Sequence, residues 1–142
     1  MEAEKIKELS VDECWALLST AVFGRIAVSI AGHPDIFPVN YVAGEGKLTF
    51  RTSEGTKLFG VTVNESVAFE VDDHTETEGW SIVVKGTART LQSESEIAEA
   101  ETLQLRPWIP TVKRNFVRID VNDITGRRFI FGPEPDRVDT PS

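Results

Sequence analysis

Hydrophobic and polar residues alternate in short runs along most of the chain, and turn-forming residues separate the runs. In one run, Ile26, Val28 and Ile30 alternate with polar or small residues. A period of two residues is typical of a strand with one face in a core. The runs with this character lie at 26–30, 36–42, 48–52, 67–71, 80–91 and 116–121. About six strands joined by hairpin-length turns favour a closed antiparallel barrel over a parallel α/β sheet.

Two segments have helical spacing instead. Ser10 and Glu13 have the spacing of a capping box, and one helical face then carries apolar side chains (Val11, Cys14, Trp15, Leu18, Val22). This pattern predicts an N-terminal helix over about residues 10–23, ended by Gly24. A second helix is predicted from Ser93, again with a glutamate at capping distance and with apolar positions facing inward (Ile97, Ala100, Leu103, Leu105). Arg106-Pro107 is expected to stop it.

Glycine and proline mark where the strands should turn or bend. Turns are predicted at 32–35 and 44–47. Pro38 cannot donate to a strand ladder, so we expect it on an edge or at a bulge that interrupts its strand. Gly86 predicts a bend or bulge in a curved sheet, and Gly126 predicts a break in the last strand.

The chain is expected to form a single domain over residues 1–142. The helix at about 10–23 precedes a barrel at about 24–131, and residues 133–142 form a loose tail rich in proline and aspartate. Asp72 to Gly79 is acidic, without apolar periodicity, and predicts an exposed loop.

Composition excludes several partners. The formal net charge of -8 removes the attraction to nucleic acid and anionic membranes. No apolar run approaches a membrane span, so we expect a cytoplasmic protein. The single cysteine, Cys14, and the two histidines offer neither a metal-ligand pattern nor a nucleophile with an oriented base, so no metal and no catalytic side chain is predicted.

The segment from Phe50 to Lys57 has the features of a phosphate site. Alternation points Leu48 and Phe50 inward and Arg51 outward, where its guanidinium can bind phosphate in a bidentate manner. A short helical stretch is predicted at 56–63, and free amides at its start would attract an anion. The polar groups that join Arg51 are Thr52, Ser53, Thr56 and Lys57. The alternative is that these charges are simply solvated around a turn.

Six segments occur in the order and spacing seen in one family. They are Gly24-Arg25-Ile26-Ala27, Phe37-Pro38-Val39-Asn40-Tyr41, Phe50 to Lys57, Val67-Ala68-Phe69-Glu70, Gly79 to Gly86 and Ile124-Thr125-Gly126-Arg127-Arg128. Over about residues 9–130 the chain resembles the pyridoxamine 5'-phosphate oxidase-like split-barrel flavoproteins. The resemblance implies a mainly β homodimer of six-stranded antiparallel split barrels with FMN bound between the subunits.

The resemblance also assigns residues to the cofactor. The FMN phosphate would lie against Arg51, Thr52, Thr56 and Lys57, and the isoalloxazine ring would lie beside Pro38, Val39, Asn40 and Tyr41. Trp80 and Trp108 are candidates for the walls of the flavin cleft, with plain core or dimer packing as the alternative. Arg127 and Arg128 could reach a flavin or an anionic substrate, or be paired with carboxylates.

The oxidases that make pyridoxal phosphate end in a segment that helps to hold the substrate phosphate, whereas this sequence continues after Phe131 as a proline-rich tail, so we do not expect it to make pyridoxal phosphate. The function that the sequence favours is an FMN-dependent oxidoreductase that acts by hydride transfer on a small-molecule substrate. Two alternatives stay open: a non-catalytic flavin storage or ligand-sensing protein, and a reductase that uses the deazaflavin F420.

Overall fold

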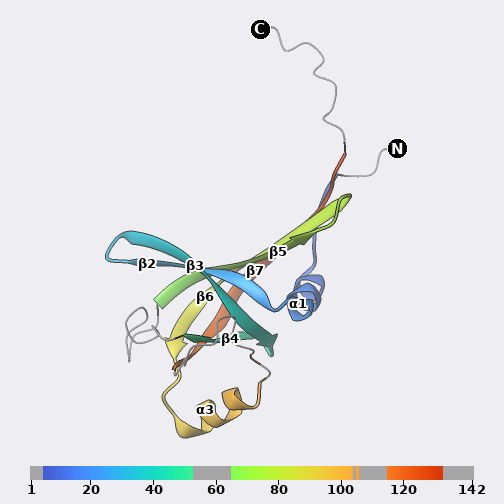
Figure 1. Ribbon diagram of the computed structural model, residues 1–142. Helices are drawn as coiled ribbons and strands as arrows, with labels where there is room; N and C mark the ends of the chain where they lie inside the picture. The colour runs from blue at the N-terminus through green and yellow to red at the C-terminus, as the bar shows by residue number, and fades with distance from the viewer. Residues whose placement is uncertain (1–4, 53–64, 104, 106–114, 133–142) are drawn as a thin grey trace.

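The computed structural model describes residues 5–52, 65–103, 105 and 115–132, and within them the chain is mainly β (Figure 1). The strands are β1 (Ile6–Glu8), β2 (Phe23–Ile30), β3 (His33–Gly44), β4 (Lys47–Thr52), β5 (Glu65–His74), β6 (Glu78–Thr90) and β7 (Asn115–Ile130). The helices are α1 (Val11–Thr20) and α3 (Glu94–Glu101). None of the helices in these ranges is long and apolar enough to cross a membrane.

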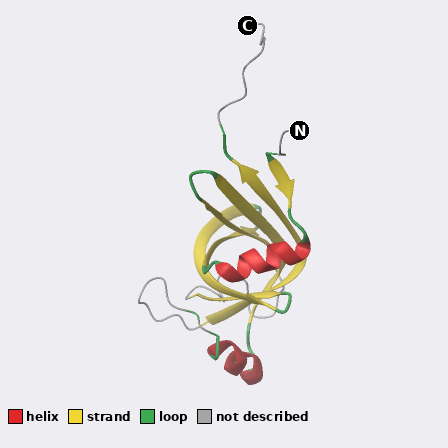
Figure 2. Cartoon of the chain, turned by 90° about the vertical axis from the view of Figure 1, so that its right-hand side faces the viewer, coloured by secondary structure: helices red, strands yellow, loops and turns green. Residues whose placement is uncertain are grey.

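The sheet closes on itself. Its strand order is β1-β7-β4-β3-β2-β5-β6, and β6 also pairs with β7, so β2 to β7 form a ring in which every pairing is antiparallel. The short β1 is added to the far end of β7, with Ile6 opposite Phe129. Figure 2 shows the strands curling around a common axis. The predicted six-stranded antiparallel split barrel with peripheral helices is therefore confirmed.

Two tight hairpins set the register of β2, β3 and β4. Ala31 and Gly32 have φ values of 51° and 80°, and Glu45 and Gly46 have values of 53° and 76°. Positive φ at both central residues is typical of a type I′ turn, whose twist matches the twist of the flanking strands. The turn predicted at 44–47 is confirmed, whereas the first turn ends earlier than predicted, because β3 already begins at His33.

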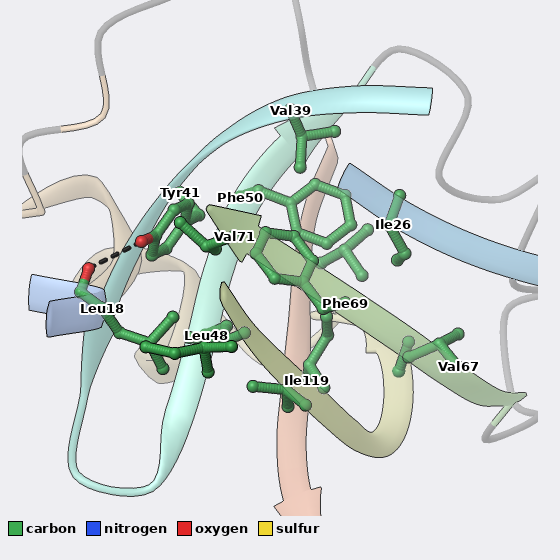
Figure 3. Close-up of a cluster of buried hydrophobic side chains, with 14 of the residues drawn as sticks. Leu18, Ile26, Val39, Tyr41, Leu48, Phe50, Val67, Phe69, Val71 and Ile119 are labelled. Carbon is green, nitrogen blue, oxygen red and sulfur yellow. Dashed lines mark hydrogen bonds between the residues drawn. The ribbon is translucent and has the colours of Figure 1, made fainter. Parts of the chain in front are cut away.

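The core lies inside the ring and is filled by the inward residues of each strand (Figure 3). The largest of these side chains include Phe50, Phe69, Ile26, Leu48 and Ile119, each at most 1% exposed. The Tyr41 hydroxyl donates a 2.6 Å hydrogen bond to the Leu18 carbonyl, and the Tyr41 ring meets the Phe69 ring edge to face. This bond ties α1 to the core through β3.

α1 packs closely against the barrel because two strand glycines leave room for it and for the core. The predicted capping box of Ser10 and Glu13 is present, but the helix ends at Thr20, earlier than predicted. Gly24 lies inside β2, where a Cβ would come within 2.5 Å of the Phe69 ring. Gly126 lies inside a continuous β7, where a Cβ would come within 2.6 Å of Cys14 Sγ. Close packing, and not chain termination, therefore explains both glycines.

α3 covers a separate patch on the outside of the barrel. Ser93 caps it by accepting a hydrogen bond from the Glu96 amide, as the sequence predicts. Ala100 is buried against Leu91 and Phe116, and Ile97 and Leu105 are partly buried at the same place. The helical stretch predicted at 56–63 and the stop predicted at Arg106-Pro107 lie outside the described residues.

Three further expectations are resolved by the sheet. The predicted acidic loop is mostly strand, because β5 continues to His74 and β6 begins at Glu78, and paired strands with solvated side chains need no apolar periodicity. The bulge at Gly86 is confirmed by a register shift after Lys85. Pro38 does not interrupt β3, but it lies on an edge: within the described ranges, residues 33–40 pair with β2 and only residues 41–44 pair with β4.

Candidate functional site

The outer faces of β3, β4 and β7 carry the polar residues of the candidate site. Leu48 and Phe50 point into the core, so Thr49 and Arg51 point outward. Arg51 lies opposite Phe116, and Thr49 lies opposite Arg118. Arg51 and Arg118 are therefore diagonal neighbours on one face of an antiparallel pair, a relation that separates residues by roughly 7–8 Å.

Arg51 is exposed, and its guanidinium lies over the Phe116 ring at 4.7 Å from the centroid. This contact holds the cation above the outer face of the barrel. Thr52 is buried and follows the inward alternation of Leu48 and Phe50, so its side chain lies on the other side of β4 from Arg51. Ser53, Thr56 and Lys57 lie outside the described residues, so their role in a phosphate site stays a prediction.

The strand predicted to run beside a flavin ring presents two different sides. Pro38 is exposed and Asn40 is half-buried, whereas Val39 and Tyr41 are buried at 6% and 2% exposure. The Tyr41 hydroxyl is engaged by Leu18, and burial raises the pKa of Tyr41. A ligand on the outside of β3 would therefore meet the backbone and the side chains of Pro38 and Asn40, but not the phenol of Tyr41.

Two hollows lie beside β3. One, of about 410 Å³, lies between the end of α1 and β3 and is lined by Val22, Asn40 and Leu105, among others. The other, of about 340 Å³, lies between the β3–β4 hairpin and α3 and is lined by Thr49, Thr102 and Arg118, among others. Val42 and Ala43 line both. Each hollow is within the size range of small-molecule sites.

Arg118 forms the base of the second hollow and was not identified from the sequence. It is 3% exposed, donates from Nε to Thr49 Oγ1 at 3.4 Å, and lies 3.6 Å from Glu96. Glu96 is itself held by a bidentate pair with Arg89, whose hydrogen bonds lower the pKa of Glu96. In the sequence, Arg118 is only a cation at a polar position of an alternating strand. What marks it as a site residue is the pairing of β7 with β4, which the sequence does not show.

Trp80 lies away from Arg51, near the other end of β7. It pairs with Arg128, twelve residues along β7 from the Phe116 that lies opposite Arg51, and it packs against the core cluster. The structure therefore does not bring Trp80 and Arg51 together within this chain. Arg128 is paired with Glu78 at 3.2 Å, while Arg127 lies opposite Ser81. Trp108 lies outside the described residues.

A charged cluster occupies the outer face of β2 and β5, beside residues 33–40 of β3. Arg25 lies opposite Pro38 on one side and Glu70 on the other. Its Nη1 lies 2.7 Å from Glu70 Oε1 and 3.0 Å from Asp72 Oδ2. Burial, followed by the adjacent Asp72 carboxylate, raises the pKa of Glu70 to about 7, although Arg25 opposes the shift. The pKa of Asp72 is lowered, first by its hydrogen bond with Glu70.

This cluster predicts a pH dependence of stability. Because the pKa of Glu70 is raised on folding from 4.5 to about 7, the folded state holds its proton more tightly, and that contribution is lost as the pH rises across this interval. Glu70→Gln does not titrate. Thermal unfolding measured from about pH 5 to 8 should show the Tm of the wild type falling relative to that of Glu70→Gln up to about pH 7. A constant difference in Tm would contradict the raised pKa.

Comparison with known proteins identifies relatives that match most of the chain. A family model for pyridoxamine 5'-phosphate oxidase matches residues 10–128. A Corynebacterium glutamicum structure, provisionally assigned as a pyridoxamine 5'-phosphate oxidase, is 42% identical, with a TM-score of 0.86 over 94% of this chain and 100% of that one. The FAD binding protein from Mycobacterium smegmatis is 43% identical, with a TM-score of 0.75 over 87% of this chain and 98% of that one. An uncharacterized Mycobacterium tuberculosis protein is 53% identical over 91 residues, 64% of this chain and 83% of that protein.

Proposed function

This chain belongs to the pyridoxamine 5'-phosphate oxidase family, and from that membership we propose that it binds a flavin nucleotide on the outer side of β3 and β4. The observation that carries the proposal is the position of Arg51, an outward guanidinium close to the part of β3 that pairs only with β2 in the described chain. The 43% identical M. smegmatis relative, a FAD binding protein, supports a flavin as the ligand.

The chemistry of the available groups fits a flavin phosphate. A guanidinium binds phosphate oxygens in a fixed fork, and Arg51 is held on the Phe116 ring in an orientation that leaves it exposed. The backbone of β3 near Pro38 and the amide of Asn40 would face the polar edge of the ring system. The neighbouring hollow of about 410 Å³ gives room beside these groups.

We propose further that the protein is an oxidoreductase that uses the bound flavin on a small-molecule substrate. A bound isoalloxazine supplies hydride transfer, and the described residues then have to orient it and exclude water. The chain contributes Arg51 as the phosphate ligand and the edge of β3 as the ring support. The sequence resemblance implies FMN as the flavin.

The cofactor is tested directly on freshly purified protein. We expect a visible flavin spectrum, with heat releasing FMN or FAD identified by mass spectrometry. Bleaching by NAD(P)H and recovery of the colour in air would support the oxidoreductase. Flavin that resists every biological donor would instead indicate storage or sensing, release of F420 would replace the flavin with a deazaflavin, and protein that neither carries nor binds any of these would refute the proposal.

We also propose a homodimer. Ile36 on β3 is 60% exposed, and the residues beside it on the neighbouring strands are Ala27 on β2 and Ala68 on β5, so this part of the outer face presents apolar surface to solvent. A second copy would cover it, as expected for an isologous interface.

The homodimer is tested by changing one apolar residue. Sedimentation at micromolar concentration should give a dimer for the wild type and a monomer for Ile36→Glu, because a charge buried in an apolar contact is costly. Ile6→Glu, at a similarly exposed site on β1, should stay dimeric. A wild-type protein that stays monomeric would contradict the proposal.

A further inference from the structure

Arg118 is a buried cation with unused capacity for hydrogen bonds. Its side chain is 4% exposed and, within the described part of the chain, makes one hydrogen bond of 3.4 Å to Thr49 Oγ1 and one ion pair of 3.6 Å with Glu96. Both carboxylate oxygens of Glu96 are already bound by Arg89, at 3.1 and 2.7 Å. A guanidinium carries five N–H donors, and buried donors are almost always satisfied. Arg118 therefore has donors left for a further acceptor.

The strand pairing places a second positive charge beside Arg118. Arg89 lies directly opposite Arg118 in the β6–β7 ladder, and like charges in directly opposite positions are destabilising. Glu96 pairs with both arginines, whereas the other nearby carboxylate, Asp120, pairs with Arg89 at 3.6 Å and not with Arg118. An anion beside Arg118 would offset this excess of positive charge.

The hollow beneath α3 gives an anion access to Arg118. Its volume is about 340 Å³, and Arg118 lines it together with the buried Thr49 and the exposed Thr102. Thr49 Oγ1 accepts a hydrogen bond from Arg118, so the proton of this hydroxyl can be donated to the same anion. The volume is sufficient for a small organic molecule.

The exposed residues of the hollow indicate the rest of the ligand. Leu103 supplies an apolar wall, while Glu45 and Glu99 are exposed beside the hollow and Lys47 is half-buried there. Charges in contact with water are screened far more than the buried charge of Arg118. The negative end of a ligand would therefore lie at Arg118, and the exposed carboxylates would accept hydrogen bonds from donors at its other end.

We propose that the α3 hollow binds a small carboxylate, whose carboxylate group pairs with Arg118 and whose opposite end carries a hydroxyl or amino group. A single negative charge matches the one buried guanidinium of the hollow, whereas a doubly charged phosphate would also be repelled by Glu45 and Glu99. The site goes beyond the proposed flavin binding and does not depend on it.

The test is isothermal titration calorimetry of the full chain with 4-hydroxybenzoate, which has a carboxylate at one end and a hydroxyl at the other. 4-Hydroxybenzamide has the same shape without the charge and should bind roughly tenfold more weakly. Arg118→Met should weaken binding of 4-hydroxybenzoate by a similar factor. Thr102→Trp should do so as well, by filling the hollow from an exposed position. Ser95→Trp, exposed on α3 but not lining the hollow, should leave the affinity unchanged.

Thr102→Trp keeps the proposal testable if Arg118→Met does not fold. The Thr102 side chain donates to the Glu99 carbonyl, so its replacement leaves Arg118 and its partners in place. Without ligand, the Tm of Thr102→Trp should be close to that of Ser95→Trp, which shows that a lost affinity is not a damaged fold.

Three results would overturn the proposal. These are equal affinity for the acid and the amide, undiminished binding of the acid to Thr102→Trp, and no binding of the acid to the wild type at millimolar concentration. Absence of flavin binding would instead refute the proposed function and leave the carboxylate site unaffected, so the two failures are distinguishable.

Discussion

Arg51→Ala is expected to raise the dissociation constant for FMN by roughly tenfold to a hundredfold, because each hydrogen bond to a charged group contributes about 1.5–3 kcal/mol. Arg51 points outward from β4 and is held on the Phe116 ring, so its removal should leave the core unchanged. Equilibrium titration of apoprotein with FMN measures the effect. The same loss should appear with FAD, since both flavins place a phosphate at this position.

Riboflavin separates a phosphate contact from general damage. It lacks the phosphate and should bind the wild type and Arg51→Ala with similar, weak affinity. Lys7→Ala removes one exposed positive charge from β1, opposite Arg128 at the far end of β7, and should leave FMN affinity unchanged. Wild-type FMN affinity in Arg51→Ala would show that the phosphate lies elsewhere.

Phe69→Ala is expected to lower the free energy of unfolding by about 3–5 kcal/mol. Phe69 is 1% exposed, lies opposite Ile26 on β2, and meets the Tyr41 ring with centroids 5.2 Å apart. Its loss should leave a cavity at the centre of the barrel that rigid strand pairing on both sides of β5 cannot close. Urea unfolding followed by tryptophan fluorescence measures the change.

Gly24 provides a coupled test of the same contact. A methyl group at Gly24 would lie 2.5 Å from the Phe69 ring, so Gly24→Ala should cost about 1–3 kcal/mol in the wild type. In Phe69→Ala the same change should cost much less, because the opposing ring is gone. If the changes in the free energy of unfolding add in the double mutant, the two positions are not in steric contact.

Alternation and turn residues were sufficient to predict the barrel. The inward positions of β4 and the bulge at Gly86 follow from period two and from the missing side chain. Gly24 was predicted to end the helix and Gly126 to break the last strand, and both predictions are wrong, because a single sequence does not show which residue will lie against a glycine. The acidic end of the β5–β6 hairpin was predicted to be a loop, but its backbone forms a strand ladder, which does not require apolar side chains.

The site was predictable only where it is local in sequence. Arg51 could be assigned to the outer face from its neighbours, and the structure places it there. Arg118 could not, because its meaning depends on pairing with Thr49, 69 residues away, and on burial beneath α3. Thr52 was assigned to the same site as Arg51 from its nearness in sequence, but a single sequence does not show that the alternation of β4 turns its buried side chain to the opposite face.

The packing of Cys14 gives the protein an internal reporter of its own motion. Cys14 is the only cysteine of the chain, is fully buried against Gly126, and burial raises its pKa. A thiol in this state is protected from alkylating reagents. Modification therefore requires α1 to leave the barrel, and the labelling rate measures how often that happens. Because the Tyr41–Leu18 bond lies on the same helix, slower labelling after a ligand is added would reveal whether occupancy on β3 is transmitted to α1.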